Sequence, residues 1–213
     1  MNTPKANWKI RCVIYDCDGV LFDSLEANTR LYNDLCAMVG RYPLREDEMH
    51  YVHTHTVFEA LHFIFGKEND LEKKALEILK AKQVDLKNYV SYLKMEPHLL
   101  QVLEKLKEKG ILRAINTNRT TSMPYIMERF ALWSYFEMVV TALDVKNPKP
   151  HPESMEKIIE GFQLKKEEAV FVGDSDVDQQ TAMSSGVKFI AYKNKEIAND
   201  LFIEDHLDIL NMI

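Results

Sequence analysis

The chain has 213 residues, of which 46% are hydrophobic and 28% charged, and its 27 basic and 33 acidic residues give a formal net charge of −6. This composition is typical of a globular protein, and the acidic balance argues against a nucleic-acid partner, which requires a basic face. No apolar run approaches the ~18 residues that cross a bilayer, so we expect no membrane partner. Residues 1–9 lack the apolar segment of a signal peptide and the three cysteines form no CxxC pair, which together predict a cytoplasmic protein without disulfides.

Strands and helices alternate along most of the chain. The first buried strand is predicted over Ile10–Asp16, which is rich in Ile, Val, Tyr and Cys. Further strands are predicted over Ile111–Asn116, Phe136–Thr141, Ala169–Val172 and Lys188–Tyr192, with helices over Met123–Phe130, Glu153–Phe162 and Val177–Ser185. This alternation predicts the α/β class, with a Rossmann-like parallel sheet core flanked by helices.

One interval breaks this alternation. From Gly19 to Gly110 the chain is far longer than the about 30 residues that a βαβ unit takes. Its apolar residues predict three helices, over Leu25–Val39, over Val57–Phe65 after a capping box of Thr56 and Glu59, and over about Asp70–Leu93. We therefore expect an inserted α-helical cap domain at residues 25–95 and an α/β core made of residues 1–24 and 96–213.

Polar side chains follow four of the predicted strands. They are Asp16 and Asp18, Thr117 and Asn118, Lys149, and Asp174 and Asp178. Because ligands bind beyond the carboxyl ends of the strands in open α/β sheets, we expect these side chains to meet. The carboxylates form an oxygen ligand set that suits Mg²⁺, and the lysine and threonine suit a phosphate group.

The same segments carry a family resemblance. Residues 16–24 (DCDGVLFDS) resemble the first motif of the haloacid dehalogenase-like hydrolase superfamily, and Thr117-Asn118 resembles its second. Lys149 between two prolines resembles the third motif, and the stretch from Gly173 to Asp178 resembles the fourth. The helical insertion between the first and second motifs is similar to the cap of the phosphoglycolate phosphatase and β-phosphoglucomutase branch.

The resemblance implies roles for the acidic residues. Asp16 would be the nucleophile that forms an aspartyl-phosphate, and Asp18 would protonate the leaving alcohol and then activate water. Mg²⁺ would be held by Asp16, by the backbone carbonyl of Asp18 and by Asp174, with Asp178 beside it. Asp18 must carry a proton in the first step, so we expect its pKa to lie above that of Asp16.

The resemblance also implies how the substrate is held. Thr117 and Asn118 would contact the transferring phosphoryl group, and Lys149 would neutralise the charge of the nucleophile and the phosphate. The expected function is therefore a Mg²⁺-dependent phosphatase that acts on a small phosphorylated metabolite such as phosphoglycolate or a sugar phosphate. The protein would act as a monomer or a homodimer.

The cap is expected to select the substrate. His53, Thr54 and His55 are its candidate specificity residues, in a stretch that we interpret as a joint between helices or a polar loop at the site entrance. A zinc site is disfavoured because the histidine spacing matches no standard pair and no cysteine lies near.

Two other functions stay open. A phosphomutase of the β-phosphoglucomutase type would carry a His near Ala27 and Asn28, where this chain has none. A catalytically inactive protein that binds a phosphorylated ligand is the second alternative.

Overall fold

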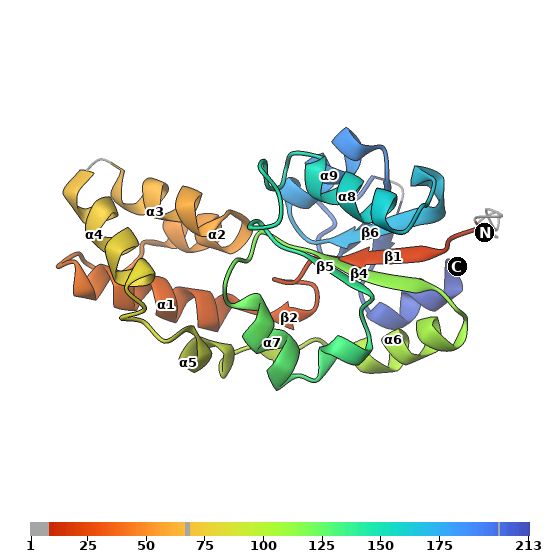
Figure 1. Ribbon diagram of the computed structural model, residues 1–213, viewed down its shortest axis with the longest axis horizontal. Coiled ribbons are helices and arrows are strands. Elements are labelled where there is room, and N and C mark those ends of the chain that lie inside the picture. Colours follow the sequence, from red (N-terminus) through yellow and green to blue (C-terminus); the bar gives the residue numbers. More distant parts are fainter. Residues whose placement is uncertain (1–8, 67–68, 200) are drawn as a thin grey trace.

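The computed structural model describes residues 9–66, 69–199 and 201–213, and its centre is a sheet of six parallel strands in the order β5–β4–β1–β6–β7–β8 (Figure 1). The strands are β1 (Cys12–Tyr15), β4 (Leu112–Asn116), β5 (Met138–Val140), β6 (Ala169–Gly173), β7 (Lys188–Tyr192) and β8 (Phe202–Ile203). The short strand β8 at the sheet edge was not predicted, whereas the parallel sheet was, and the predicted fold class is confirmed.

Both faces of the sheet are covered by helices. The side chains of β1 alternate, because successive residues of a strand point to opposite faces. Val13 and Tyr15 pack with helices α6 (Leu99–Glu108) and α7 (Met123–Arg129). Cys12 and Ile14 pack on the other side with α8 (Glu153–Gly161), beside α9 (Asp176–Ser185) (Figure 1). Every side chain of β1 is therefore buried, as its continuous apolar sequence indicates.

A second group of helices extends beyond the carboxyl ends of the strands (Figure 1). It comprises α1 (Leu25–Met38), α2 (Glu46–Thr54), α3 (Val57–Phe65), α4 (Asn69–Lys80) and α5 (Leu86–Val90). This group has its own hydrophobic cluster, which is separate from the clusters on the two sheet faces and includes Leu35, Leu61 and Ala75. Val90 packs with the sheet region instead. The domain limits at residues 25 and 95 remain a prediction.

The structure corrects one of the predicted helices in this region. The single helix expected over Asp70–Leu93 is wrong, because Lys82 adopts a left-handed backbone conformation with φ of 52° and ends the first of two helices. Asp85 then begins α5, since its side chain accepts a hydrogen bond of 3.0 Å from the backbone N–H of Lys87. The helix expected after Thr56 is present, and it begins with the predicted capping box between Thr56 and Glu59.

Helix α2 was not predicted. It contains His50 and His53, so the interpretation of this stretch as a joint or loop is wrong up to Thr54, where the helix ends. Glu48 stabilises its first turn, because the buried carboxylate accepts a hydrogen bond of 2.9 Å from the backbone N–H of Arg45 and pairs with Arg41. Such a helix is held by buried polar contacts, which apolar periodicity does not reveal.

The two regions are joined by a pair of short strands. β2 (Phe22–Asp23) pairs antiparallel with β3 (Lys94–Met95), where the chain leaves the sheet region and where it returns. The two chain segments that connect the sheet region with the helical region therefore lie side by side. No helix in the described ranges combines the length and the apolar character that a bilayer-spanning segment needs.

Candidate functional site

The predicted site residues meet at the carboxyl edge of the sheet. Asp16 follows β1, and its backbone N–H donates a hydrogen bond of 2.9 Å to the carbonyl of Val172 in β6. Thr117 follows β4, and its backbone N–H donates one of 3.0 Å to the carbonyl of Val140 in β5. These bonds extend the ladders of the sheet by one residue, so the side chains at the strand ends are held on a rigid framework.

Lys149 is a buried cation between two carboxylates. Its Nζ lies 2.8 Å from Oδ1 of Asp16 and 2.6 Å from Oδ1 of Asp178, and only 3% of its side chain is exposed. Burial by itself lowers the pKa of Lys149, but the two carboxylates outweigh this and raise it. Asn118 fixes the loop, because its Nδ2 donates a hydrogen bond of 3.1 Å to the carbonyl of Lys149. The lysine is therefore charged and held in place.

Asp16, Asp174 and Asp178 form a compact acidic cluster. Each offers a carboxylate oxygen, and these atoms lie within 4.8 Å of one another. Burial and mutual repulsion raise the pKa of Asp16 to about 7, against the opposing charge of Lys149, and raise the pKa of Asp174 well above its usual range. A cation at this position would relieve the repulsion. Oxygen ligands of this kind suit a hard divalent cation.

The three carboxylates are not equivalent. Asp178 is fully buried and its Oδ2 accepts a hydrogen bond of 2.6 Å from the hydroxyl of Ser175, while its Oδ1 faces Lys149. Within the described parts of the chain, no group donates a hydrogen bond to the carboxylate of Asp174. Asp174 is thus open to a ligand, whereas Asp178 mainly positions Lys149 and the start of α9.

Two glycines allow this close packing. Gly19 has a φ of +71°, and a Cβ on it would overlap with the carboxylate of Asp174. A Cβ on Gly173 would overlap with the side chain of Asp178. Both positions therefore require glycine for the two acidic segments to approach each other.

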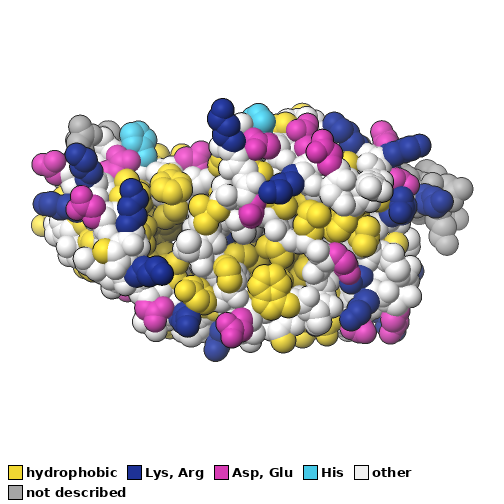
Figure 2. Space-filling model, in the orientation of Figure 1, with side chains coloured by type: hydrophobic (Ala, Val, Ile, Leu, Met, Phe, Trp, Pro, Cys, Tyr) yellow, Lys and Arg dark blue, Asp and Glu magenta, His cyan; other side chains and the backbone are white. Residues whose placement is uncertain are grey.

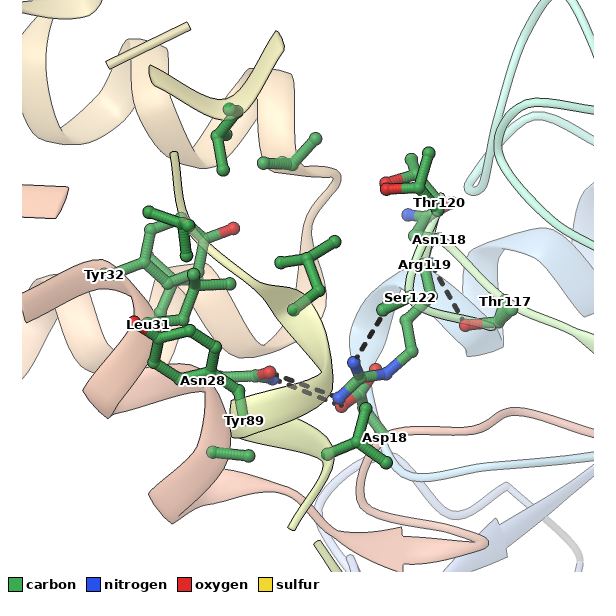
Figure 3. A pocket seen from close by; sticks show the side chains of 18 of the residues that line it. Asp18, Asn28, Leu31, Tyr32, Tyr89, Thr117, Asn118, Arg119, Thr120 and Ser122 are labelled. Carbon is green, nitrogen blue, oxygen red and sulfur yellow. Dashed lines mark hydrogen bonds and ion pairs between the residues drawn. The ribbon is translucent and has the colours of Figure 1, made fainter. Parts of the chain in front are cut away.

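Asp18 lies in a second network that joins the two regions (Figure 3). Its Oδ1 accepts hydrogen bonds of 2.6 Å from Nη2 of Arg119 and of 3.2 Å from Nδ2 of Asn28. The same Nδ2 lies 3.5 Å from Nδ1 of His53 in α2. Arg119 from the sheet region and Asn28 from α1 therefore converge on one carboxylate, and His53 of α2 lies beside Asn28.

The electrostatics of Asp18 bear on the expected order of the two pKa values. Burial raises the pKa of Asp18, but the charge of Arg119 and its hydrogen bond outweigh burial and hold this pKa below its usual range. The pKa of Asp16 lies above its usual range, but a cation bound at the acidic cluster would lower it, so the expected order of the two pKa values in the Mg²⁺-bound protein stays a prediction. The two carboxylates differ because each has a different cation: Lys149 is shared between Asp16 and Asp178, whereas Arg119 pairs with Asp18 directly.

Arg119 and Asn28 had no predicted role. The sequence signal for Arg119 is its place immediately after Thr117-Asn118, where a basic residue at a strand end faces the acidic residues of the neighbouring strand. The signal for Asn28 is only indirect, since it lies near the place where the resemblance to the phosphomutases would put a His. Only the packing of α1 against the sheet edge brings it to Asp18.

A cavity of about 770 Å³ opens above this cluster, between the sheet and the helices. Asp16, Asp18, Thr117, Asn118 and Lys149 line its floor. The candidate specificity residues His53 and His55 also line it, and the side chain of Thr54 lies outside the described residues. Burial lowers the pKa of His53, against the opposing charge of Asp18.

Comparison with known proteins gives one family. The sequence profile of the haloacid dehalogenase-like hydrolases matches residues 13–192. The chain is 27% identical to a phosphoglycolate phosphatase of Rhodobacter capsulatus, over 84% of this chain and 83% of that one. It is 27% identical to a pyrophosphatase of Bacillus cereus, over 86% and 83% of the two chains. The crystal structure of a HAD-superfamily hydrolase from Geobacter sulfurreducens is 39% identical, with a TM-score of 0.77 and 97% of both chains covered.

Proposed function

Because the chain belongs to the haloacid dehalogenase-like hydrolases, we propose that it is a Mg²⁺-dependent phosphatase of a small phosphorylated organic metabolite. The observation that carries this proposal is the position of Asp16. Its carboxylate lies 2.8 Å from Nζ of Lys149, belongs to the acidic cluster and lines the floor of the cavity. An anionic nucleophile beside cations is what attack on a phosphate dianion requires.

The acidic cluster fits Mg²⁺. Asp16, Asp174 and the backbone carbonyl of Asp18 would hold the ion, and Asp178 would support them through Lys149 and Ser175. The carboxylates that repel one another in the structure are the groups that a divalent cation neutralises. When bound, Mg²⁺ supplies positive charge against the phosphate oxygens and orients the phosphoryl group.

In the first step an oxygen of the Asp16 carboxylate attacks phosphorus. The bond from phosphorus to the alcohol oxygen breaks, and Asp18 gives its proton to the departing alcohol. Asp18 has to release Arg119 before it can carry that proton, because the ion pair favours the ionised carboxylate. The buried Nε of Arg119 has no hydrogen-bond partner among the described residues, so this side chain has capacity for another anion.

In the second step Asp18 takes a proton from water. The resulting hydroxide oxygen attacks phosphorus of the aspartyl-phosphate, which releases orthophosphate and restores Asp16. Thr117, Asn118 and Lys149 would hold the phosphoryl oxygens in both steps. The helices of residues 25–95, the proposed cap, would contact the rest of the substrate.

A screen of phosphorylated compounds tests this function. The purified protein is given Mg²⁺ and a generic aryl phosphate, phosphoglycolate, sugar phosphates or pyrophosphate, and released orthophosphate is measured with and without a chelator. We expect release that requires Mg²⁺. Interconversion of sugar phosphate isomers in place of release would establish a phosphomutase, and binding of these compounds without turnover would establish an inactive binding protein.

A further inference from the structure

The cavity above the acidic cluster continues into the helical region. Its lining includes Leu31 and Tyr32 of α1, Val52 of α2 and Leu79 of α4, together with Val84 in the turn before α5. All of these residues are buried or half-buried. The part of the cavity away from the strand ends is therefore a hollow lined by side chains of the helices.

The wall of this hollow is apolar. The charged residues that the helical region contributes to the lining are all exposed and so lie at the opening: Lys80, Lys82, Asp85 and Lys87. Figure 2 shows hydrophobic side chains gathered along the face where the helices meet the sheet region. The phosphate-binding groups are confined to the floor, on the side of Arg119 and Thr117, opposite Leu31 and Tyr32 (Figure 3).

The size of the cavity does not match a short, highly charged substrate. Volumes of about 300 to 1,000 Å³ are typical of sites that enclose ligands of drug-like size. Phosphoglycolate and pyrophosphate are too short to fill the cavity, and a charged group that reached Leu31 and Val52 would find no hydrogen-bond donor in these side chains, which is unfavourable. An apolar group at the same place would bind favourably, because both its own surface and the apolar wall of the cavity would be removed from water.

We propose that the natural substrate is the phosphate monoester of an alcohol with an extended alkyl or aryl group, which occupies the hollow between α1, α2 and α4. This inference rests on the proposed phosphatase function and adds the substrate class. Leu31, Val52 and Leu79 are the specificity-determining residues, because they line the hollow and carry no polar atom beyond the backbone.

The test is a series of linear alkyl phosphates from ethyl to octyl phosphate, with Mg²⁺, scored by kcat/KM for orthophosphate release. Each methylene group buried in the hollow should raise kcat/KM by about fourfold. Phosphoglycolate and pyrophosphate should be poorer substrates than hexyl phosphate. A flat or falling series, with phosphoglycolate or pyrophosphate preferred, would leave the phosphatase function standing and overturn the proposed substrate class.

Substitution at the wall supplies the control. Leu31→Gln should flatten the dependence on chain length while ethyl phosphate is still hydrolysed, and Leu31→Met should retain the dependence. Met38→Gln is the matched variant, because Met38 is on the same helix, is 47% exposed and does not line the cavity. If Leu31→Gln and Met38→Gln respond alike, the wall does not select the substrate and the proposal fails.

A binding measurement separates the two proposals. Alkyl phosphonates of the same chain lengths cannot be hydrolysed, and their affinity is measured by calorimetry with Mg²⁺ present. Affinity that rises with chain length in the natural protein and not in Leu31→Gln supports the substrate class even if no compound is turned over. Affinity independent of chain length contradicts it, whatever the outcome for catalysis.

Discussion

Nη2 of Arg119 lies 2.6 Å from Oδ1 of Asp18, although the two residues are 101 positions apart in the chain. The contact joins the second predicted motif to the first, and only 13% of each side chain is exposed. It holds the carboxyl proposed as general acid in its ionised form. Any reaction in which Asp18 donates a proton therefore depends on the position of Arg119.

Removing this cation should change the pH dependence of activity. In Arg119→Ala the burial of Asp18 is no longer outweighed, so the pKa of Asp18 rises. The limb of the kcat/KM profile that reports loss of the Asp18 proton should move to higher pH for an alkyl phosphate, whatever the change in absolute rate. Arg119→Lys should shift it less. Identical profiles for all three proteins would contradict a coupling between these residues.

Asp16→Asn should abolish phosphate release, because an amide cannot act as the nucleophile. We expect kcat to fall by about 10⁴-fold or more. The unfolding temperature should change little, since Asn has nearly the shape of Asp and Lys149 keeps its ion pair with Asp178. Asp176→Asn, at an exposed position in the first turn of α9, is the matched control and should keep full activity. Phosphate release by Asp16→Asn at the natural rate would rule out the mechanism.

Lys149→Met should destabilise the fold as well as prevent catalysis. It leaves Asp16 and Asp178 buried without their shared cation, and loss of one partner of a buried pair costs about 3 to 5 kcal/mol in the free energy of unfolding. Urea unfolding measures this cost. Lys73→Met, at an exposed position of α4, should change the same free energy by less than about 0.5 kcal/mol. Equal effects of the two substitutions would show that the buried pairs do not contribute to stability.

Mg²⁺ should raise the unfolding temperature. Binding to the folded state alone stabilises by about 2.7 kcal/mol at a concentration of 100 times the Kd, which corresponds to about 5 to 10 °C for a chain of this length. A chelator should reverse the shift. Asp174→Asn should remove it, whereas Asp176→Asn should keep it, since only Asp174 belongs to the acidic cluster. A shift that survives in Asp174→Asn would locate the ion elsewhere.

Acid should destabilise the protein partly through His206. This residue is fully buried, Nε2 lies 2.8 Å from the carbonyl of Val20 and the ring stacks on Tyr192. Burial lowers its pKa, against the opposing influence of the Val20 carbonyl, Glu96 and Asp205. The unfolded chain therefore binds the proton more readily, so the stabilising contribution is present above the unfolded pKa of about 6.5 and is lost as pH falls below it.

The measurement for this residue is the free energy of unfolding at pH ~7.5 and pH ~5.5. The natural protein should lose more of it on acidification than His206→Gln does. His62→Gln, at an exposed position of α3, should behave like the natural protein. If His206→Gln retains the full loss, acid destabilisation has another source.

Much of the site follows from the order of residues along the chain. Asp16, Thr117 and Asp174 each come directly after or close to the end of an apolar segment that can only be a buried strand. Parallel strands bring their carboxyl ends to the same edge, so side chains at those positions meet whatever the details of packing. The seven predicted core residues accordingly lie together, although their catalytic roles remain proposals.

The helical region was predicted less well. The sequence indicates that it is helical and where Thr56 begins one helix, but it shows neither the break at Lys82 nor helix α2. The break depends on the left-handed backbone of Lys82, and helix α2 depends on contacts such as the pairing of buried Glu48 with Arg41, neither of which periodicity encodes. A helix whose stability comes from buried polar groups has few of the apolar repeats by which helices are recognised.

The sequence by itself determined the family, the sheet and the chemistry at the strand ends, because local apolar patterns fix the strands and parallel pairing fixes their common edge. The tertiary structure decided what surrounds that chemistry. It placed Arg119 and Asn28 on Asp18, lowered the pKa of Asp18 through that ion pair and opened an apolar hollow behind Leu31. These features depend on how helices from distant parts of the chain pack against the sheet, and no local sequence pattern specifies that packing.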